Sequence, residues 1–338
     1  RPILDAGQKL HAAGVPPQLD RAPVVEALKT LAADAPLNYA AAGGRFHAPR
    51  SLDDLAAWRA ERPQARVLAG STDVGLWVTK QFRELPELIY VGEVAELQRI
   101  EVTEAHIAIG AGATLEAAWS ALAAEWPELR DVWLRFASLP VRQAGTMGGN
   151  VANGSPIGDS APVLIALGAS LVLRQGPRLR RMLLEDFYVD YMKNRLEPGE
   201  FVQALEVPRR GPGQRMRVYK ISKRFDCDIS AVCAALRVEL DGETIAAARL
   251  AFGGMAGIVK RAAGAEDALS GQPWNEAALT AAQAALATDF TPLTDLRASA
   301  AYRLQVSQNL LRRFWLETRP VDPLPEAAVT VWAREATA

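Results

Sequence analysis

The first two thirds of the chain alternate short apolar runs with segments of helical spacing. Apolar runs at residues 66–70, 88–91 and 106–110 predict strands, because each is short and is bounded by polar residues or glycine. Ser51 is a typical N-cap for a following helix, and the spacing of apolar residues from Leu115 to about Glu125 predicts another helix. This alternation indicates an α/β or α+β domain.

The pattern changes at residues 208–213, where prolines and glycines cluster as they do at a domain boundary. Beyond it, strands are expected at 217–221, 230–240 and 246–253, and Ala-rich helices around 261–288 and 295–318. These elements predict a small α+β domain with one sheet and trailing helices. At the other end, residues 1–36 contain short helical segments and loop signals such as Pro16-Pro17, with helical spacing from Val24 to Ala33, and predict a tail or linker.

Composition excludes several classes of function. Lys plus Arg total 38 against 39 for Asp plus Glu, so the net charge of -1 gives no electrostatic case for a nucleic acid or an anionic membrane. No apolar run approaches the ~20 residues that a membrane span needs. Cys227 and Cys233 are the two cysteines and the three histidines stand apart, so no disulfide framework, metal site or catalytic triad is expected. The expected location is a reducing compartment, the cytoplasm.

Two glycine-rich loops carry the strongest candidate chemistry. Residues 70–75 follow a predicted strand, and residues 145–150 lie in the irregular stretch 137–160, which we expect to be a functional loop. Glycine lets a phosphate approach the main chain, and the Ser and Thr hydroxyls add donors. Each loop alone also fits an ordinary turn, whereas together they predict a clamp around a pyrophosphate. No Gly-Lys-Ser/Thr follows, so ATP or GTP binding is disfavoured.

Two other motifs favour structural interpretations. Residues 106–115 imitate the start of a dinucleotide fingerprint, but Leu115 stands at the third glycine position and no acidic residue is well placed about 20 residues later. Core packing therefore explains these glycines better. Tyr219 to Asp228 gathers basic, aromatic and acidic residues at a strand end, and taken alone it is typical of a charged loop.

Three motifs in order, at residues 67–75, 145–150 and 155–159, resemble the FAD-binding domain of the molybdenum hydroxylases. That family includes xanthine dehydrogenase, aldehyde oxidase and the medium subunit of carbon monoxide dehydrogenase. The resemblance extends from about residue 45 to residue 318. It implies an α+β fold with a two-lobed FAD-binding domain of the PCMH/vanillyl-alcohol-oxidase type and a small α+β flavoprotein C-terminal domain. The implied ranges are a linker at 1–42 after an iron–sulfur domain, the FAD-binding domain at 43–212 with two subdomains split near 100, the C-terminal domain at 213–320 and a tail at 321–338.

The family pattern implies which residues bind the cofactor. Residues 67–74 would wrap the FAD pyrophosphate, with Gly70, Ser71 and Thr72 as donors, and residues 146–150 would bind the same group from the other side. The implied cofactor-binding residues are Val67, Leu68, Ala69, Gly70, Ser71, Thr72, Asp73, Val74, Phe136, Thr146, Met147, Gly148, Gly149, Asn150, Asp159, Val202 and Lys220.

Near the flavin, Phe136 would pack against the isoalloxazine ring and Val202 would touch the cofactor. Asp159 would contact the adenosine ribose region. Lys220 would place a positive charge near the ring, which favours the reduced, anionic flavin. Residues 224–228 would influence access of NAD+, and they are less acidic here than in other members, which leaves the balance between oxidase and dehydrogenase open.

The start of the chain, Arg1-Pro2-Ile3, resembles the residues after the last cluster cysteine of the family's iron–sulfur domain. This implies preceding [2Fe–2S] domains, as in the small chain of bacterial xanthine dehydrogenases. The implied function is an electron relay from a purine, hydroxylated at the molybdenum cofactor of a molybdopterin-binding large subunit, through the clusters to FAD and as hydride to NAD+. A heterotetramer of two small and two large chains is implied. Two alternatives stay open: the flavin subunit of another molybdenum hydroxylase, acting on carbon monoxide, an aldehyde, nicotine or an aromatic acyl-CoA, and a nucleotide-binding domain without a redox role.

Overall fold

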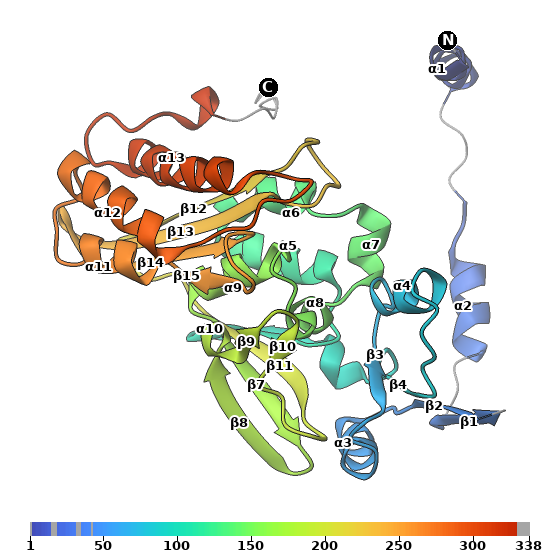
Figure 1. Cartoon of the computed structure of the whole chain (residues 1–338). Helices are drawn as coiled ribbons and strands as arrows, with labels where there is room; N and C mark the ends of the chain where they lie inside the picture. The colour runs from blue at the N-terminus through green and yellow to red at the C-terminus, as the bar shows by residue number, and fades with distance from the viewer. Residues whose placement is uncertain (1, 15–18, 32–34, 42, 330–338) are drawn as a thin grey trace. The chain divides into compact units, whose positions relative to one another are not determined.

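The computed structural model describes residues 2–14, 19–31, 35–41 and 43–329, and the chain divides into two compact units, residues 1–36 and 37–338. The first unit contains helices α1 (Pro2–Ala13) and α2 (Ala22–Thr30), which have no buried residue (Figure 1). The helical segments expected in this part of the sequence are confirmed. Arg1, Pro16-Pro17 and the end of the predicted helix at residues 32–33 lie outside the described residues.

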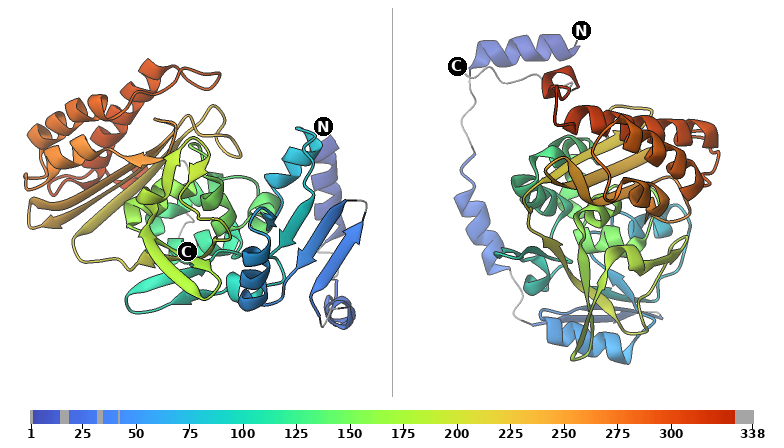
Figure 2. Two further views of the ribbon diagram at one scale, coloured as in Figure 1. Left: turned by 60° about the horizontal axis from the view of Figure 1, so that its bottom comes forward. Right: turned by 90° about the vertical axis from the view of Figure 1, so that its left-hand side faces the viewer.

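The second unit begins with a four-stranded sheet in the order β1-β2-β4-β3 (Figure 2). Its elements are β1 (Leu37–Ala41), β2 (Gly44–Ala48), α3 (Leu52–Glu61), β3 (Arg66–Leu68), α4 (Val74–Thr79) and β4 (Glu87–Tyr90). The Ser51 hydroxyl accepts a hydrogen bond from Asp54 N at 3.1 Å, so the predicted N-cap is confirmed. Leu37 pairs with Ala48 across β1 and β2, so this sheet starts at residue 37.

A five-stranded sheet, β5-β6-β11-β7-β8, follows, with every neighbouring pair antiparallel. Its strands are β5 (Ile100–Val102), β6 (His106–Gly110), β7 (Ser170–Gln175), β8 (Arg178–Leu183) and β11 (Phe201–Pro208). The accompanying elements are η1 (Ala95–Gln98), α5 (Leu115–Glu125), η2 (Pro127–Leu129), α6 (Arg130–Arg135), α9 (Ser160–Leu167), α10 (Leu184–Phe187), β9 (Tyr188–Asp190) and β10 (Lys193–Asn194). A Cβ atom added at Gly110 would lie 2.2 Å from the Leu97 carbonyl oxygen. Close backbone packing, as predicted, explains this glycine.

The stretch 137–160 is not the long loop that the sequence predicts. It contains two short helices, α7 (Leu139–Ala144) and α8 (Met147–Asn153). The glycines in α8 lower its intrinsic helix propensity and so hide it in the sequence. Capping compensates, because the Thr146 hydroxyl accepts from Gly149 N at 3.1 Å, and Gly154 ends the helix with a left-handed φ of 67°.

The C-terminal part is an antiparallel sheet in the order β12-β13-β14-β15 with three helices and a short 3-10 turn. Its elements are β12 (Gln214–Ile221), β13 (Val232–Asp241), β14 (Thr244–Gly253), β15 (Lys260–Arg261), α11 (Ala263–Leu269), α12 (Glu276–Asp289), α13 (Ala300–Thr318) and η3 (Glu326–Ala328). The helix predicted around 261–288 is two helices. The chain breaks at Gly271, which has a φ of 72°, and restarts at Asn275, whose side chain accepts from Ala278 N at 3.0 Å.

Strand β13 is buried on both faces and joins two hydrophobic cores. Cys233 and Ala235 belong to the larger core, which contains α9, whereas Val232 and Ala234 belong to the core formed with α11, α12 and α13. Alternate side chains of a strand point to opposite faces, so α9 covers one face of this sheet and the C-terminal helices cover the other (Figure 1). Within the described ranges, no helix has the length and apolar character needed to cross a bilayer.

Candidate functional site

The turn that follows β3 and the turn between α7 and α8 lie against each other. A Cβ atom added at Gly70 would lie 1.7 Å from the carbonyl oxygen of Ala144, so main chain touches main chain and only glycine fits. A Cβ atom at Gly145 would lie 3.2 Å from Thr72 Oγ1, which places this hydroxyl beside the second turn. The two glycine-rich loops are far apart in the sequence but in contact in the fold, as a joint role requires.

The first turn presents a row of unused backbone donors. Among the described residues, no acceptor is found for the N–H groups of residues 70–74, although Gly75 N donates to the Ser71 carbonyl oxygen at 2.9 Å. Ser71 has a φ of 61°, a left-handed conformation that is uncommon for residues other than glycine. Successive free N–H groups of this kind form a concave site for an anion.

The residues beside these donors hold the turn in place. Val67 and Ala69 pack against the larger core, and the Leu68 carbonyl oxygen accepts from Val91 N at 2.8 Å. Asp73 is the N-cap residue of α4, but its side chain makes no capping bond. Val74 begins that helix. Residues 67–69 thus fix the end of β3 against the core, and the free N–H groups belong to residues 70–74.

The second turn contributes less main chain than the sequence suggests. The N–H groups of Met147, Gly148 and Gly149 donate to Ala113 O, Ala111 O and Thr146 Oγ1 at 2.9, 2.9 and 3.1 Å. A Cβ atom at Gly148 would lie 2.4 Å from that of Ala111, so this glycine serves the approach of α8 to the strand end. A ligand at this turn would therefore meet the side chains of Thr146 and Asn150 rather than three free N–H groups.

Two buried side-chain oxygens close to α8 and α9, Asn150 Oδ1 and Ser160 Oγ, have no hydrogen-bond partner in the described part of the chain. A Cβ atom at Gly158 would lie 3.6 Å from Asn150 Oδ1, which puts Asn150 beside the loop leading into α9. The N–H groups of Ser160 and Ala161 also lack an acceptor among these residues. Unpaired buried polar groups are costly, so this region favours a ligand with both donors and acceptors.

Asp159 and Lys220 form a buried ion pair. Lys220 Nζ donates to Asp159 Oδ2 at 2.7 Å, and the two residues are 3% and 2% exposed. Ser230 Oγ accepts from Lys220 Nζ at 2.7 Å and donates to Asp159 Oδ1 at 2.6 Å. The family resemblance implies contacts of Asp159 and Lys220 with different parts of the cofactor. In the structure the two residues are paired, and both carboxylate oxygens of Asp159 have a protein partner. Burial, and then the charge of Asp159, raises the pKa of the nearby Cys233 thiol well above its ordinary value.

Phe136 lies half-buried at the end of α6, with its ring centroid 6.0 Å from that of Trp119. Arg142 Nη1 donates to the carbonyl oxygens of Phe136 and Ala137 at 2.8 and 2.9 Å, and Arg142 Nε donates to Glu116 Oε2 at 2.5 Å. Ala137 has a φ of 48°, which a non-glycine residue holds only when its surroundings enforce it. The buried Arg142 guanidinium supplies that constraint and fixes the backbone beside the Phe136 ring.

The loop between β12 and β13 packs on the same segment. Arg135 Nε donates to the Phe225 carbonyl oxygen at 2.7 Å and Arg135 Nη2 donates to that of Lys220 at 3.0 Å. Cys227 N donates back to the Arg135 carbonyl oxygen at 3.1 Å. Three side chains that organise this region, Arg135, Arg142 and Ser230, are not marked as site residues by any pattern in the sequence. Their partners are remote in the sequence, and no local motif marks them.

Val202 lies in β11, 8% exposed, where the register with β7 shifts. The next residue, Gln203, accepts from Ala111 N at 3.0 Å, and Ala111 in turn accepts from Gly148 N. Among the described residues no hydrogen bond or ring contact joins Val202 or Phe136 directly to the two turns. The structure thus brings the turns together and pairs Asp159 with Lys220, while Val202 and Phe136 stand on neighbouring elements.

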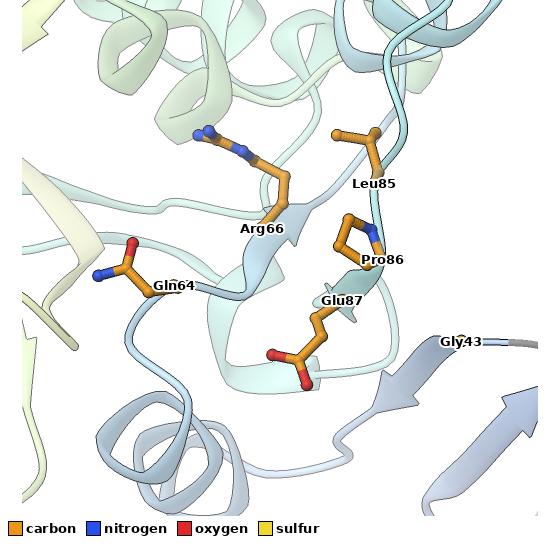
Figure 3. A pocket seen from close by; sticks show the side chains of 6 residues that line it. All are labelled: Gly43, Gln64, Arg66, Leu85, Pro86 and Glu87. Atoms are coloured by element: carbon orange, nitrogen blue, oxygen red, sulfur yellow. The ribbon is translucent and has the colours of Figure 1, made fainter.

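The hollow drawn in Figure 3 is a separate feature, with a volume of about 370 Å³. Its lining residues are Gly43, Gln64, Arg66, Leu85, Pro86 and Glu87. It lies at the start of β3, whereas the Gly70 turn follows the end of that strand. Its carboxylate, on Glu87, is already paired with Arg62 at 2.8 Å. No group of three metal-ligating side chains is found in the described ranges.

Two family profiles match the chain in succession. The first is described as the FAD binding domain in molybdopterin dehydrogenase and matches residues 38–210. The second is described as the CO dehydrogenase flavoprotein C-terminal domain and matches residues 217–318. The Asp159–Lys220 pair therefore joins one matched domain to the other.

Curated relatives include a xanthine dehydrogenase of Emericella nidulans, 28% identical over 295 residues, which cover 83% of this chain and 22% of the relative. A nicotinate hydroxylase of the same organism is 30% identical over 291 residues, covering 79% of this chain and 22% of the relative. The chain thus spans about a fifth of the length of these curated relatives.

Among solved structures, a chain of carbon monoxide dehydrogenase from Hydrogenophaga pseudoflava has a TM-score of 0.75 and is 26% identical. The match covers 81% of this chain and 96% of that chain. The predicted α+β fold, an FAD-binding domain followed by a flavoprotein C-terminal domain, is confirmed by this likeness and by the two profiles.

Proposed function

This chain belongs to the family of FAD-binding domains of the molybdopterin dehydrogenases, and we propose that it is the electron-transfer flavin part of a xanthine dehydrogenase that reduces NAD+. The family assigns FAD as the cofactor. The observation that carries the proposal is the contact between the turns at Gly70 and Ala144, beside the free N–H groups of residues 70–74.

These residues fit a dinucleotide with a diphosphate. The free N–H groups of residues 70–74 would bind phosphate oxygens, and the Thr72 hydroxyl, which lies beside the second turn, would add a further donor. The unpaired oxygens of Asn150 and Ser160 would accept hydrogen bonds from hydroxyl groups of the same molecule. Glycine at position 70 keeps both turns close enough to act on one ligand.

The flavin end would lie toward Phe136 and the Asp159–Lys220 pair. A bound flavin supplies the hydride and electron-transfer chemistry, while the protein supplies position and charge. Arg142 holds the backbone beside the Phe136 ring, so this ring would offer a fixed apolar surface to an aromatic ligand. Lys220 would place a positive charge there, and Val202 would close the site from β11.

The remaining steps belong to other parts of the enzyme. We propose that electrons arrive from a purine oxidised at a molybdenum cofactor on a large subunit, through [2Fe–2S] clusters, and leave to NAD+. The small share of the curated relatives that this chain spans supports the presence of such further domains or chains. Electron relay requires no general acid or base here, which agrees with the lack of a triad in the sequence. The assembly that we propose is a heterotetramer of two small and two large chains.

A second candidate keeps the flavin and changes the substrate. Similarity to a nicotinate hydroxylase and to carbon monoxide dehydrogenase supports a flavin subunit of another molybdenum hydroxylase as this second candidate. The partner's active site would set the substrate. Reduction of NAD+ with xanthine, measured in the complex with the molybdenum-containing partner, separates the two: xanthine turnover supports the first candidate, and turnover of nicotinate or carbon monoxide alone supports the second.

Flavin retention tests the cofactor site itself. Thr72→Asp would place a carboxylate beside a phosphate, and Gly149→Trp would fill the space next to Thr146, so neither variant should retain FAD. Matched controls are Thr280→Asp, on the exposed side of α12, and Gly257→Trp, at a glycine with no heavy atom within 4 Å of its added Cβ. Folded Thr72→Asp and Gly149→Trp proteins with the flavin content of their controls would contradict the site.

A further inference from the structure

Ser230 occupies a special place in the buried pair of Asp159 and Lys220. Its hydroxyl accepts from the Lys220 ammonium at 2.7 Å and donates to Asp159 Oδ1 at 2.6 Å. The same ammonium donates to Asp159 Oδ2 at 2.7 Å. Each of the three side chains therefore contacts the other two, and Ser230 itself is 1% exposed. A serine in this position is the neutral member of a closed hydrogen-bonded triangle.

The triangle spans the boundary between the two parts of the chain. Asp159 immediately precedes α9, Lys220 lies in β12, and Ser230 lies two residues before β13. The backbone of Lys220 is also tied to Arg135, the residue before Phe136, at 3.0 Å. The position of the ammonium is thus coupled to the segment that carries the aromatic ring.

One N–H group of the Lys220 ammonium has no hydrogen-bond partner among the described residues. A lysine ammonium carries three N–H bonds and accepts none. Two of them reach Asp159 and Ser230, and the third has no acceptor within the described residues. Because Lys220 is 3% exposed, this donor is largely screened from bulk solvent.

We propose that Ser230 is a positioning residue that sets the direction and effective charge of the Lys220 ammonium toward the bound flavin. The inference rests on the proposed function, in which Lys220 lies near the ring. The Ser230 hydroxyl donates a hydrogen bond to Asp159 and so partly neutralises the carboxylate. It also accepts a hydrogen bond from the Lys220 ammonium, so Lys220 cannot direct all three of its N–H groups to the carboxylate. The third donor then stays available to the cofactor.

Removal of the hydroxyl has a definite consequence. In Ser230→Ala, Asp159 Oδ1 loses its donor, and the ammonium is drawn toward both carboxylate oxygens. Less positive charge then faces the flavin, so the negative charge that accompanies reduction is less stabilised. The expected result is about a tenfold shift of the redox equilibrium toward the oxidised form, which is about 30 mV lower for a two-electron couple.

The test measures the flavin midpoint potential by spectroelectrochemistry in the full chain. The control is Ser307→Ala, the same change at a buried hydroxyl in α13 whose contact is Met255 Sδ at 3.2 Å. A second variant, Ser230→Cys, keeps the size of the side chain but has only a weak hydrogen-bond donor. It is used if Ser230→Ala does not retain FAD, and it should shift the midpoint potential in the same direction. FAD binding to the apoprotein and the melting temperature are measured in parallel.

A lower potential in both Ser230 variants, with the wild-type potential in Ser307→Ala, supports the proposal. So does at least tenfold weaker FAD binding in both Ser230 variants when their melting temperatures fall no further than that of Ser307→Ala. Wild-type potential and affinity in Ser230→Ala, or an equal shift in Ser307→Ala, would overturn it. A wild-type chain that takes up no FAD contradicts the proposed function instead, so the two failures are distinguishable.

Discussion

The carbonyl oxygen of Ala144 lies 1.7 Å from the point where a side chain at Gly70 would begin. No other residue type can occupy position 70 while the two turns keep this distance. The contact joins the turn after β3 to the end of α7, and the N–H groups of residues 70–74 have no acceptors among the described residues. The fold thus places free donors where two remote segments meet.

Gly70→Ala should separate the two turns, because its methyl group would overlap Ala144 O. We expect FAD affinity to fall at least tenfold, which is about 1.4 kcal/mol, as followed by titration of the apoprotein with FAD and flavin fluorescence. Gly257→Ala is the matched control, since its added Cβ meets no heavy atom within 4 Å. Equal affinities for the two variants would show that the contact has no part in binding.

Phe136→Ala should weaken FAD binding through loss of apolar surface and stacking, by about 1 kcal/mol or more. The ring is half-buried against Trp119, so truncation also leaves a gap at the proposed flavin position. Phe82→Ala, at a side chain that is 86% exposed, should bind FAD normally. Isothermal calorimetry distinguishes the variants, and an unchanged dissociation constant for Phe136→Ala would remove this residue from the site.

Arg142→Met should destabilise the folded chain by about 3 kcal/mol, because it removes the buried cation paired with Glu116 and the donor to the Phe136 and Ala137 carbonyl oxygens, while Trp133 Nε1 remains as a donor to Glu116. Arg181→Met breaks the pair with Glu206, but the Arg181 side chain is 61% exposed, and the expected loss is below about 1 kcal/mol. Urea unfolding of both variants checks the difference. A loss for Arg142→Met no larger than for Arg181→Met would argue against a role in holding the Phe136 segment.

Glu200 makes part of the stability of the fold dependent on pH. Burial by itself raises the pKa of this carboxyl, but hydrogen bonds from Arg180 and from Glu197 N outweigh it and hold the pKa below its ordinary value of 4.5. A lowered pKa contributes stability above pH 4.5 that is lost as the pH falls through the folded-state pKa.

Glu200→Gln should therefore cost about 2 kcal/mol at pH 7, and the difference from wild type should shrink as the pH falls below 4.5. Chemical unfolding at several pH values measures this difference. A gap between wild type and variant that stays constant down to pH 3 would refute the assignment.

Local patterns predicted much of the framework. The predicted strand at 106–110 and the predicted helix from Leu115 to Glu125 agree with β6 and α5, because apolar spacing and a Thr114 cap act over a few residues. The helices inside 137–160 were not predicted. In α8 the glycines lower the helix propensity, and part of its stabilisation comes from Ala111 and Ala113, which are distant in the sequence.

The part of the candidate site that is a backbone turn could be predicted from the sequence. The side-chain pairs whose two residues are far apart in the sequence could not. The turn at Gly70 is indicated by consecutive glycine, serine and threonine residues. The pairing of Asp159 with Lys220, and the part of Ser230 in it, depends on how the sheet that contains β12 packs over α9 through its strands β13 and β14. No local spacing contains that information.

Hydrogen–deuterium exchange with and without FAD tests most directly whether the two turns bind the cofactor. Peptides that cover residues 67–75 and 145–150 should exchange more slowly when FAD is bound, because free N–H groups gain acceptors and the turns lose freedom, while a peptide over β8 should not change. Binding of FAD that leaves both turns exchanging at the rate of the apoprotein would contradict the account.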